Sequence, residues 1–215
     1  MMGAIGYLVV AAACLVHWDA ADKLRYLDVF SVSVLAFSFL LAAEQTLFHW
    51  RLPARREVTQ EAYGMTFDPQ LSTLTSGLAL IELLVFFDYG HTHWLTYPVH
   101  PSIQTFGIFM YLAAVFWLNW VDGFLAREFN SMPRRSIIRE GPFSYIRHPR
   151  YLGLLVSRVA FAMTMSSVLA AIVLVGWLCV VLRRIHLEER HLLTIFGEKY
   201  KRYSQESSRL VPGLF

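Results

Sequence analysis

The sequence is poor in the residues that hold soluble or covalently cross-linked domains together. Only two of its 215 residues are cysteines, and both Cys14 and Cys179 fall inside apolar segments. Cysteines in such positions predict small buried side chains and indicate neither a disulfide framework nor a thiolate metal site. Charged residues make up only 16% of the chain, whereas hydrophobic residues make up 56%. Both fractions lie far from those of an average soluble domain, and they exclude that class.

Several ligand-binding patterns are also missing. No GxGxxG run follows a strand, so the sequence does not predict a dinucleotide-binding fold. His91, His93 and His100 share one loop, but no carboxylates or thiolates accompany them at the spacing of metal ligands, and we expect no metal site. The net charge of +3 is modest, and we expect no nucleic-acid partner.

The most prominent feature that is present is a set of apolar runs. They occupy roughly residues 3–18, 29–50, 74–96, 103–125 and 151–182, and a helix needs about 20 apolar residues to cross a bilayer. The pattern predicts an all-α fold, a polytopic integral-membrane helical bundle. The last run is too long for one crossing and is interrupted near Thr164–Ser167, which predicts a helical hairpin with two short arms. Whether these arms span the bilayer stays open. We expect the second arm to continue beyond the membrane as a helix, because Ile185, Leu192, Leu193 and Phe196 keep a helical apolar spacing until Gly197 supplies a stop.

The distribution of basic residues predicts how the bundle is oriented. Lys and Arg follow the second, fourth and last apolar runs, whereas residues 91–102 contain none. Because basic residues concentrate on the cytoplasmic side, we expect both termini to be cytoplasmic and residues 91–102 to face outward. The first apolar run has no basic residues before it and no clear cleavage site, so we expect it to be retained as a span.

Residues able to do chemistry gather on the predicted cytoplasmic side. The run Gly-Pro-Phe-Ser-Tyr-Ile-Arg-His-Pro-Arg-Tyr-Leu-Gly occupies residues 141–153, and Arg184, Glu188 and Glu189 follow the hairpin. Arg184 and Glu188 are four residues apart on a predicted helix and could form a plain ion pair, but Arg before Glu is the weaker order. Two adjacent carboxylates instead suit a cationic ligand. The His148-Pro149 pair could equally have a purely structural role, because proline often begins a helix and favours an extended residue before it.

The same residues resemble a known family. The run at 141–153, the hairpin, Glu188-Glu189, the segment Phe-Gly-Glu-Lys-Tyr at 196–200 and the closing Arg-Leu-Val-Pro at 209–212 are similar to the isoprenylcysteine carboxyl methyltransferases and related membrane phospholipid methyltransferases. The resemblance covers about residues 139–213. It implies one membrane domain over 1–215, in which 1–130 form transmembrane helices 1–4 and 131–215 form the cofactor loop, the hairpin and a cytosolic helix and tail.

The resemblance also implies an activity and a site. It implies methyl transfer from S-adenosylmethionine to a lipophilic acceptor, foremost a carboxylate on an isoprenylcysteine-like substrate, at a pocket in contact with membrane lipids. Arg184 and Glu188 would be catalytic, with Arg184 facing the acceptor. The cofactor would be held by Gly141, Pro142, Tyr145, Arg147, His148, Pro149, Tyr151, Gly153, Glu188 and Glu189.

Other acceptors and other functions remain open at this stage. A phospholipid amine or a small thiol would have to lose a proton, for which Glu188 or His148 is the candidate base. A sterol-reductase type of enzyme using NADPH and a scaffold whose arginines bind lipid headgroups are further alternatives. Glu82 and Arg158 lie inside apolar runs, so we expect them to face the bundle interior, either paired with each other or lining an acceptor tunnel. Asn119 and Asp122 could reach the cofactor pocket.

Overall fold

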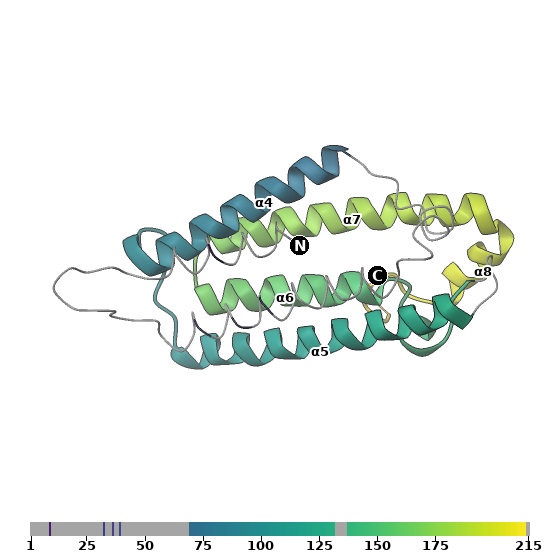
Figure 1. Cartoon of the computed structure of the whole chain (residues 1–215), viewed down its shortest axis with the longest axis horizontal. Helices are drawn as coiled ribbons and strands as arrows, with labels where there is room; N and C mark the ends of the chain where they lie inside the picture. Colours follow the sequence, from purple (N-terminus) through teal and green to yellow (C-terminus); the bar gives the residue numbers. More distant parts are fainter. Residues whose placement is uncertain are drawn as a thin grey trace.

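The computed structural model describes residues 69–131 and 137–213, together with positions 9, 32, 36 and 39. The two contiguous ranges are almost wholly helical (Figure 1). Their elements are α4 (Pro69–Phe87), the π-helix η2 (Asp88–Thr92), α5 (Pro101–Ser131), the 3-10 helix η3 (Gly141–Ser144), α6 (Pro149–Met165), α7 (Val168–Phe196) and α8 (Glu198–Glu206). Within these ranges the only strand-like pairings are two isolated bridges. The all-α prediction is therefore confirmed, whereas the first two expected spans lie outside the described ranges.

In the described ranges, three helical segments are long and apolar enough to cross a membrane. They are Thr73–Thr92, Pro101–Glu128 and Val168–Phe196. The helix α5 runs past the predicted end of the fourth apolar segment and continues to Ser131. These segments support an integral-membrane protein, in agreement with the apolar runs of the sequence.

The predicted hairpin is present, but its arms are unequal. The helix α6 ends at Met165, Ser166 takes a left-handed conformation with φ of 48°, and α7 begins at Val168. With 17 and 29 residues, the arms are about 26 and 44 Å long at 1.5 Å per residue. The longer arm continues to Phe196 and ends at Gly197, as the sequence predicts. It therefore carries Glu188 and Glu189 to the end of the bundle where α6 begins.

The helices pack into a bundle in which the described residues form several apolar clusters. The helices α5 and α6 run side by side, and α7 lies between this pair and α4 in the view of Figure 1. Gln104 of α5 donates from Nε2 to the Thr164 carbonyl at 3.0 Å, which fixes the turn of the hairpin against α5. The cluster with the most buried residues is formed by Val85, Phe86, Tyr111, Val115, Leu118, Ala160, Phe161, Met165 and Ala170.

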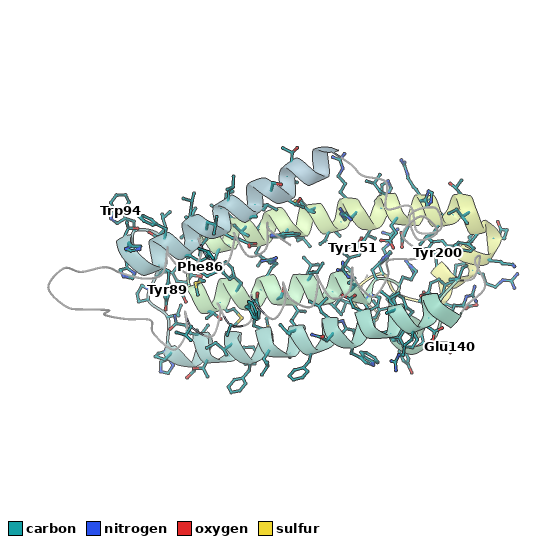
Figure 2. All side chains as sticks on the ribbon, in the orientation of Figure 1. Phe86, Tyr89, Trp94, Glu140, Tyr151 and Tyr200 are labelled. Carbon is teal, nitrogen blue, oxygen red and sulfur yellow. The ribbon has the colours of Figure 1, made fainter. Side chains whose placement is uncertain are left out.

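The two ends of the bundle are formed by different elements. At one end, the loop after η2 meets the turn of the hairpin, because the Tyr97 amide donates to the Ser166 carbonyl at 2.8 Å and the Val168 amide donates to the Leu95 carbonyl at 2.9 Å. Figure 2 shows Tyr89 and Trp94 at this end, and Tyr151 and Tyr200 toward the other, where α8 lies. The candidate site is at the α8 end.

Candidate functional site

The loop before α6 is shaped by a glycine and a proline. Gly141 has φ of +58°, a conformation that L side chains rarely adopt, and a Cβ added there would lie 2.6 Å from Cε2 of Phe124. Glycine is thus required both by the backbone and by the ring beneath it. At the other end of the loop, Pro149 is the first residue of α6 and His148 precedes it as the N-cap. A proline at this position is already set for the helix and lacks an N–H that would otherwise need a partner.

The C-terminal tail pairs with this loop along the backbone. The Arg147 amide donates to the Ser208 carbonyl at 2.8 Å, and the His148 amide donates to the Arg209 carbonyl at 3.1 Å. In the reverse direction, the Ser208 amide donates to the Tyr145 carbonyl at 3.1 Å. Three bonds over so few residues make a short parallel pairing that fixes the tail beside His148.

The helix α8 is docked by two tyrosines. Tyr203 donates from its hydroxyl to the Phe143 carbonyl at 2.7 Å, while Tyr200 is 2% exposed. Burial raises the pKa of Tyr200 well above its ordinary value and raises the pKa of Tyr203 to about 12. Both hydroxyls are therefore neutral donors at physiological pH.

Glu189 is the centre of a buried charge cluster. Arg147 Nε lies 3.0 Å from Glu189 Oε1, and Arg209 Nε lies 3.0 Å from Glu189 Oε2. The Arg147 guanidinium also donates from Nη1 to the carbonyls of Ser204 and Ser207. A carboxylate with one guanidinium on each oxygen is well compensated for its burial. Glu189 thus joins α7, the loop and the tail.

Glu188 has a different environment from its neighbour. Its side chain is 25% exposed, against 10% for Glu189. Tyr151 of α6 lies close enough to Glu188 for the charge of this carboxylate to act on its hydroxyl, and His148 Nδ1 lies 3.9 Å from Glu188 Oε2. The other ring nitrogen of His148 lies 3.5 Å from Glu189 Oε1, so the imidazole stands between the two carboxylates. Within the described part of the chain, no arginine forms an ion pair with Glu188, so its carboxylate can accept from a ligand.

A pocket of about 490 Å³ opens beside this cluster. It is lined by Arg147, Glu189, Leu193, Tyr200, Ser204, Ser207, Ser208, Arg209 and Gly213. Its volume falls in the range of roughly 300–1,000 Å³ that is usual for small-molecule sites. The Tyr200 hydroxyl is buried without a hydrogen-bond partner among the described residues, and it can donate to a ligand in this pocket. Guanidinium groups, serines and a carboxylate suit a zwitterionic amino-acid ligand such as S-adenosylmethionine.

The structure brings some of the predicted site residues together and separates others. Arg147, His148, Tyr151, Glu188 and Glu189 meet at the α8 end of the bundle. The buried Pro142 and Pro149 shape the loop between them. These residues remain predicted cofactor contacts.

Three predicted site residues have other surroundings. Tyr145 is 74% exposed. A Cβ at Gly153 would lie 2.8 Å from Trp117 Cδ1 and 2.9 Å from Leu118 Cδ2, so the packing of α6 on α5 is sufficient to require glycine there. Arg184 is exposed on α7 near Tyr151, and in the described ranges it forms no ion pair with Glu188. The alternative of a plain intrahelical pair is therefore not what the structure shows.

The polar residues inside the apolar runs are paired. Arg158 Nη1 lies 2.8 Å from Glu82 Oε1, and Trp177 Nε1 donates to the same oxygen at 2.9 Å. Arg150 Nε lies 2.9 Å from Asp122 Oδ1. Asn119 donates to the Val115 carbonyl within α5 at 3.2 Å. Of the two interpretations of Glu82 and Arg158, the paired one is what the structure shows.

Most of the pocket residues that were not predicted from the sequence come from α8 and the tail. Ser204, Ser207, Ser208 and Arg209 line the pocket, yet serines in a polar tail carry no distinctive pattern. A signal did exist for Arg209, which belongs to the closing Arg-Leu-Val-Pro of the family pattern. The partner of Arg209 could not be read from the sequence, because it lies twenty positions earlier on another helix.

The chain is similar to known membrane methyltransferases. A family model described as phospholipid methyltransferase matches residues 99–199. This segment includes the loop, the hairpin and the start of α8.

The relatives are named either as methanethiol S-methyltransferases or as protein-S-isoprenylcysteine O-methyltransferases. The chain is 30% identical to methanethiol S-methyltransferase 2 of Bradyrhizobium diazoefficiens over 68% of its own length and 61% of the relative's length. It is 22% identical to a protein-S-isoprenylcysteine O-methyltransferase of Dictyostelium discoideum, over 87% and 82% of the two chains. For protein-S-isoprenylcysteine O-methyltransferase B of Arabidopsis thaliana, the identity is 28% and the two coverages are 66% and 72%.

The alignments cover between 24% and 61% of the lengths of the methanethiol S-methyltransferases matched. The two isoprenylcysteine relatives are covered more fully. With the family match at residues 99–199 and the loop, the hairpin and the glutamate pair Glu188-Glu189 that it contains, the chain is similar to the phospholipid and isoprenylcysteine methyltransferases.

Proposed function

We propose that this protein transfers a methyl group from S-adenosylmethionine to a lipophilic acceptor that reaches the site through the membrane. The first candidate reaction is carboxyl methylation of an isoprenylcysteine-like substrate. The observation that carries the proposal is the meeting of His148 with Glu188 and Glu189, at 3.9 and 3.5 Å, beside a pocket of about 490 Å³. The relatives named as O- and S-methyltransferases support the same chemistry.

The residues fit the two charged ends of such a cofactor. The guanidinium group of Arg147 lines the pocket and can bind a carboxylate. The exposed face of Glu188, beside the pocket, can accept from an ammonium group or offset a sulfonium charge. Bound there, the cofactor supplies a methyl group that is already activated for transfer. The work of the protein is then to position the two reactants and exclude water.

The position of Arg184 favours a carboxylate as the methyl acceptor. It is exposed on α7, on the same helical face as Glu188, and close enough to Tyr151 for its charge to be felt there. A cation at that place can hold a carboxylate acceptor, which needs no general base because it is already ionised. We also infer that this end of the bundle faces the cytosol, since most Lys and Arg residues lie on this side.

A small thiol is the second candidate acceptor, because several relatives are named methanethiol S-methyltransferases. This reaction would need a base to take the thiol proton. His148 stands between two carboxylates and is the group suited to that task.

Labelled methyl transfer tests the proposal and separates the acceptors. Purified protein is incubated with methyl-labelled S-adenosylmethionine and either membrane extract or methanethiol. Volatile label released only after alkaline hydrolysis indicates a methyl ester, whereas volatile label without alkali indicates a thioether. Label that survives alkali indicates an N-methyl product. If the folded protein transfers no label and binds no S-adenosylhomocysteine, the proposed function is wrong.

A further inference from the structure

Arg209 reaches the acidic pair from a part of the chain that sequence reasoning left outside the site. Its Nε lies 3.0 Å from Glu189 Oε2, and its carbonyl accepts from the His148 amide at 3.1 Å. One tail residue therefore contacts the carboxylate through its side chain and the loop through its backbone. Arg209 also lines the pocket.

The charges of the cluster explain why the tail is needed. Glu189 is 10% exposed and Arg147 only 8% exposed, so this pair is nearly shielded from water. Arg147 occupies one oxygen of the carboxylate, and without Arg209 the second oxygen would lose its ion-pair partner. A buried carboxylate that loses a partner turns or draws in water. His148, 3.5 Å from the same carboxylate, would then lose its fixed neighbour as well.

We propose that Arg209 is a positioning residue for the methyl-donor site, acting through Glu189 to hold Arg147 and His148 in the arrangement that binds the donor. The inference rests on the proposed function, because it concerns binding of that donor. It assigns the two carboxylates different tasks. Glu189 is committed to arginines from the loop and the tail, which leaves Glu188 to meet the ligand.

A double-mutant cycle measures whether Arg209 acts through Glu189. The full-length protein, Arg209→Ala, Glu189→Gln and the double variant are titrated with S-adenosylhomocysteine by calorimetry. Arg202→Ala serves as the matched control, because Arg202 is an exposed arginine of α8, seven residues before Arg209. We expect Arg209→Ala to weaken binding about tenfold, as for loss of a charge-assisted contact. We expect the double variant to bind no more weakly than Glu189→Gln alone, because coupled residues are not additive.

Kinetics distinguish positioning from a general loss of structure. In Arg209→Ala, the KM for S-adenosylmethionine should rise by about the same factor, while kcat at saturating donor stays within about twofold. Arg209→Lys should recover part of the affinity, because an ammonium group still pairs with one oxygen of Glu189. If Arg209→Ala unfolds, the comparison of Arg209→Lys with wild type carries the test. If Arg209→Lys bound S-adenosylhomocysteine as tightly as Arg202→Ala does, the proposal would be contradicted.

The outcomes separate this inference from the proposed function. If wild type binds S-adenosylhomocysteine and Arg209→Ala binds it equally well, the inference is wrong and the function stands. Strictly additive losses in the double variant also overturn it, because they mean that Arg209 acts independently of Glu189. If wild type itself binds neither donor nor product, the proposed function fails and this inference fails with it.

Discussion

Arg158 and Glu82, which are 76 positions apart in the chain, form an ion pair of 2.8 Å between α6 and α4. Trp177 of α7 completes the group, since its indole donates to the same Glu82 oxygen and its ring lies 4.6 Å from the Arg158 guanidinium carbon. The cluster therefore joins three helices through polar contacts. In an apolar bundle such contacts fix which helix faces meet, because dispersion forces alone discriminate weakly between them.

Breaking this cluster on one side should destabilise the bundle. Glu82→Leu leaves the guanidinium of Arg158 in an apolar setting without its carboxylate, for which we expect a loss of about 3 kcal/mol. Trp177→Phe removes one hydrogen bond and keeps an aromatic face, so the expected loss is about 1 kcal/mol. Unfolding of the detergent-solubilised protein gives both values. The double variant Glu82→Leu with Arg158→Leu should be more stable than Glu82→Leu alone. A double variant that is less stable would contradict this account of the pair.

The close packing of α6 on α5 predicts a penalty at one glycine. A Cβ at Gly153 would overlap Trp117 and Leu118, whereas a Cβ at Gly123 of α5 meets nothing within 4 Å. We expect Gly153→Ala to lose about 1–3 kcal/mol through overpacking. Gly123→Ala is the matched control and should be neutral or gain up to about 1 kcal/mol from helix propensity. Thermal melting of both variants in one detergent checks the difference. Equal melting temperatures would show that α6 can shift to make room.

Much of this fold could be predicted because its signals are local. The apolar runs predicted α4, α5 and α7, the interruption near Thr164 predicted the hairpin, and Gly197 predicted the end of α7. Each of these features depends on residues that are close in sequence, such as an apolar stretch or a turn. The continuation of α7 beyond the apolar run to Phe196 was predicted as well, because the apolar residues keep a helical spacing up to Gly197.

The candidate site was only partly predictable, because its contacts join residues that are far apart in the sequence. The family pattern drew attention to His148, Glu188 and Glu189, which the structure brings within 4 Å. The contact of Arg209 with Glu189 depends on how the tail folds back, and nothing in the local sequence encodes that distance. The exposure of Tyr145 and the packing around Gly153 could not be predicted from the sequence either, because both depend on which neighbouring segments cover these residues.

The two adjacent glutamates should respond differently to the same change. Glu188→Gln removes a charge from a carboxylate that is 25% exposed, so we expect little loss of stability. We expect its kcat/KM for the donor to fall roughly ten- to a hundredfold, as for loss of a charge-assisted hydrogen bond. Glu189→Gln leaves the buried Arg147 without its carboxylate and should also cost about 3 kcal/mol of stability. Melting and methyl-transfer kinetics on both variants test the contrast, and identical profiles would contradict the division of tasks.

The docking of α8 predicts a dependence of stability on alkaline pH. Burial raises the pKa of Tyr203 to about 12, against about 10 for an unfolded tyrosine. Between these values the unfolded chain releases the tyrosine proton while the folded protein keeps it. The stability that comes from the neutral, buried hydroxyl is therefore complete below about pH 10 and is lost progressively up to about pH 12.

Replacement of Tyr203 tests this dependence directly. Tyr203→Phe removes the hydrogen bond to the Phe143 carbonyl, and at neutral pH we expect a loss of about 1 kcal/mol. The variant should also lose less stability between pH 10 and pH 12 than wild type, because it has one titrating group fewer. Tyr145→Phe is the matched control, since that tyrosine is 74% exposed and its ring is not buried against α8. Denaturant unfolding at several pH values gives both comparisons, and a wild-type slope retained in Tyr203→Phe would mean that another group causes it.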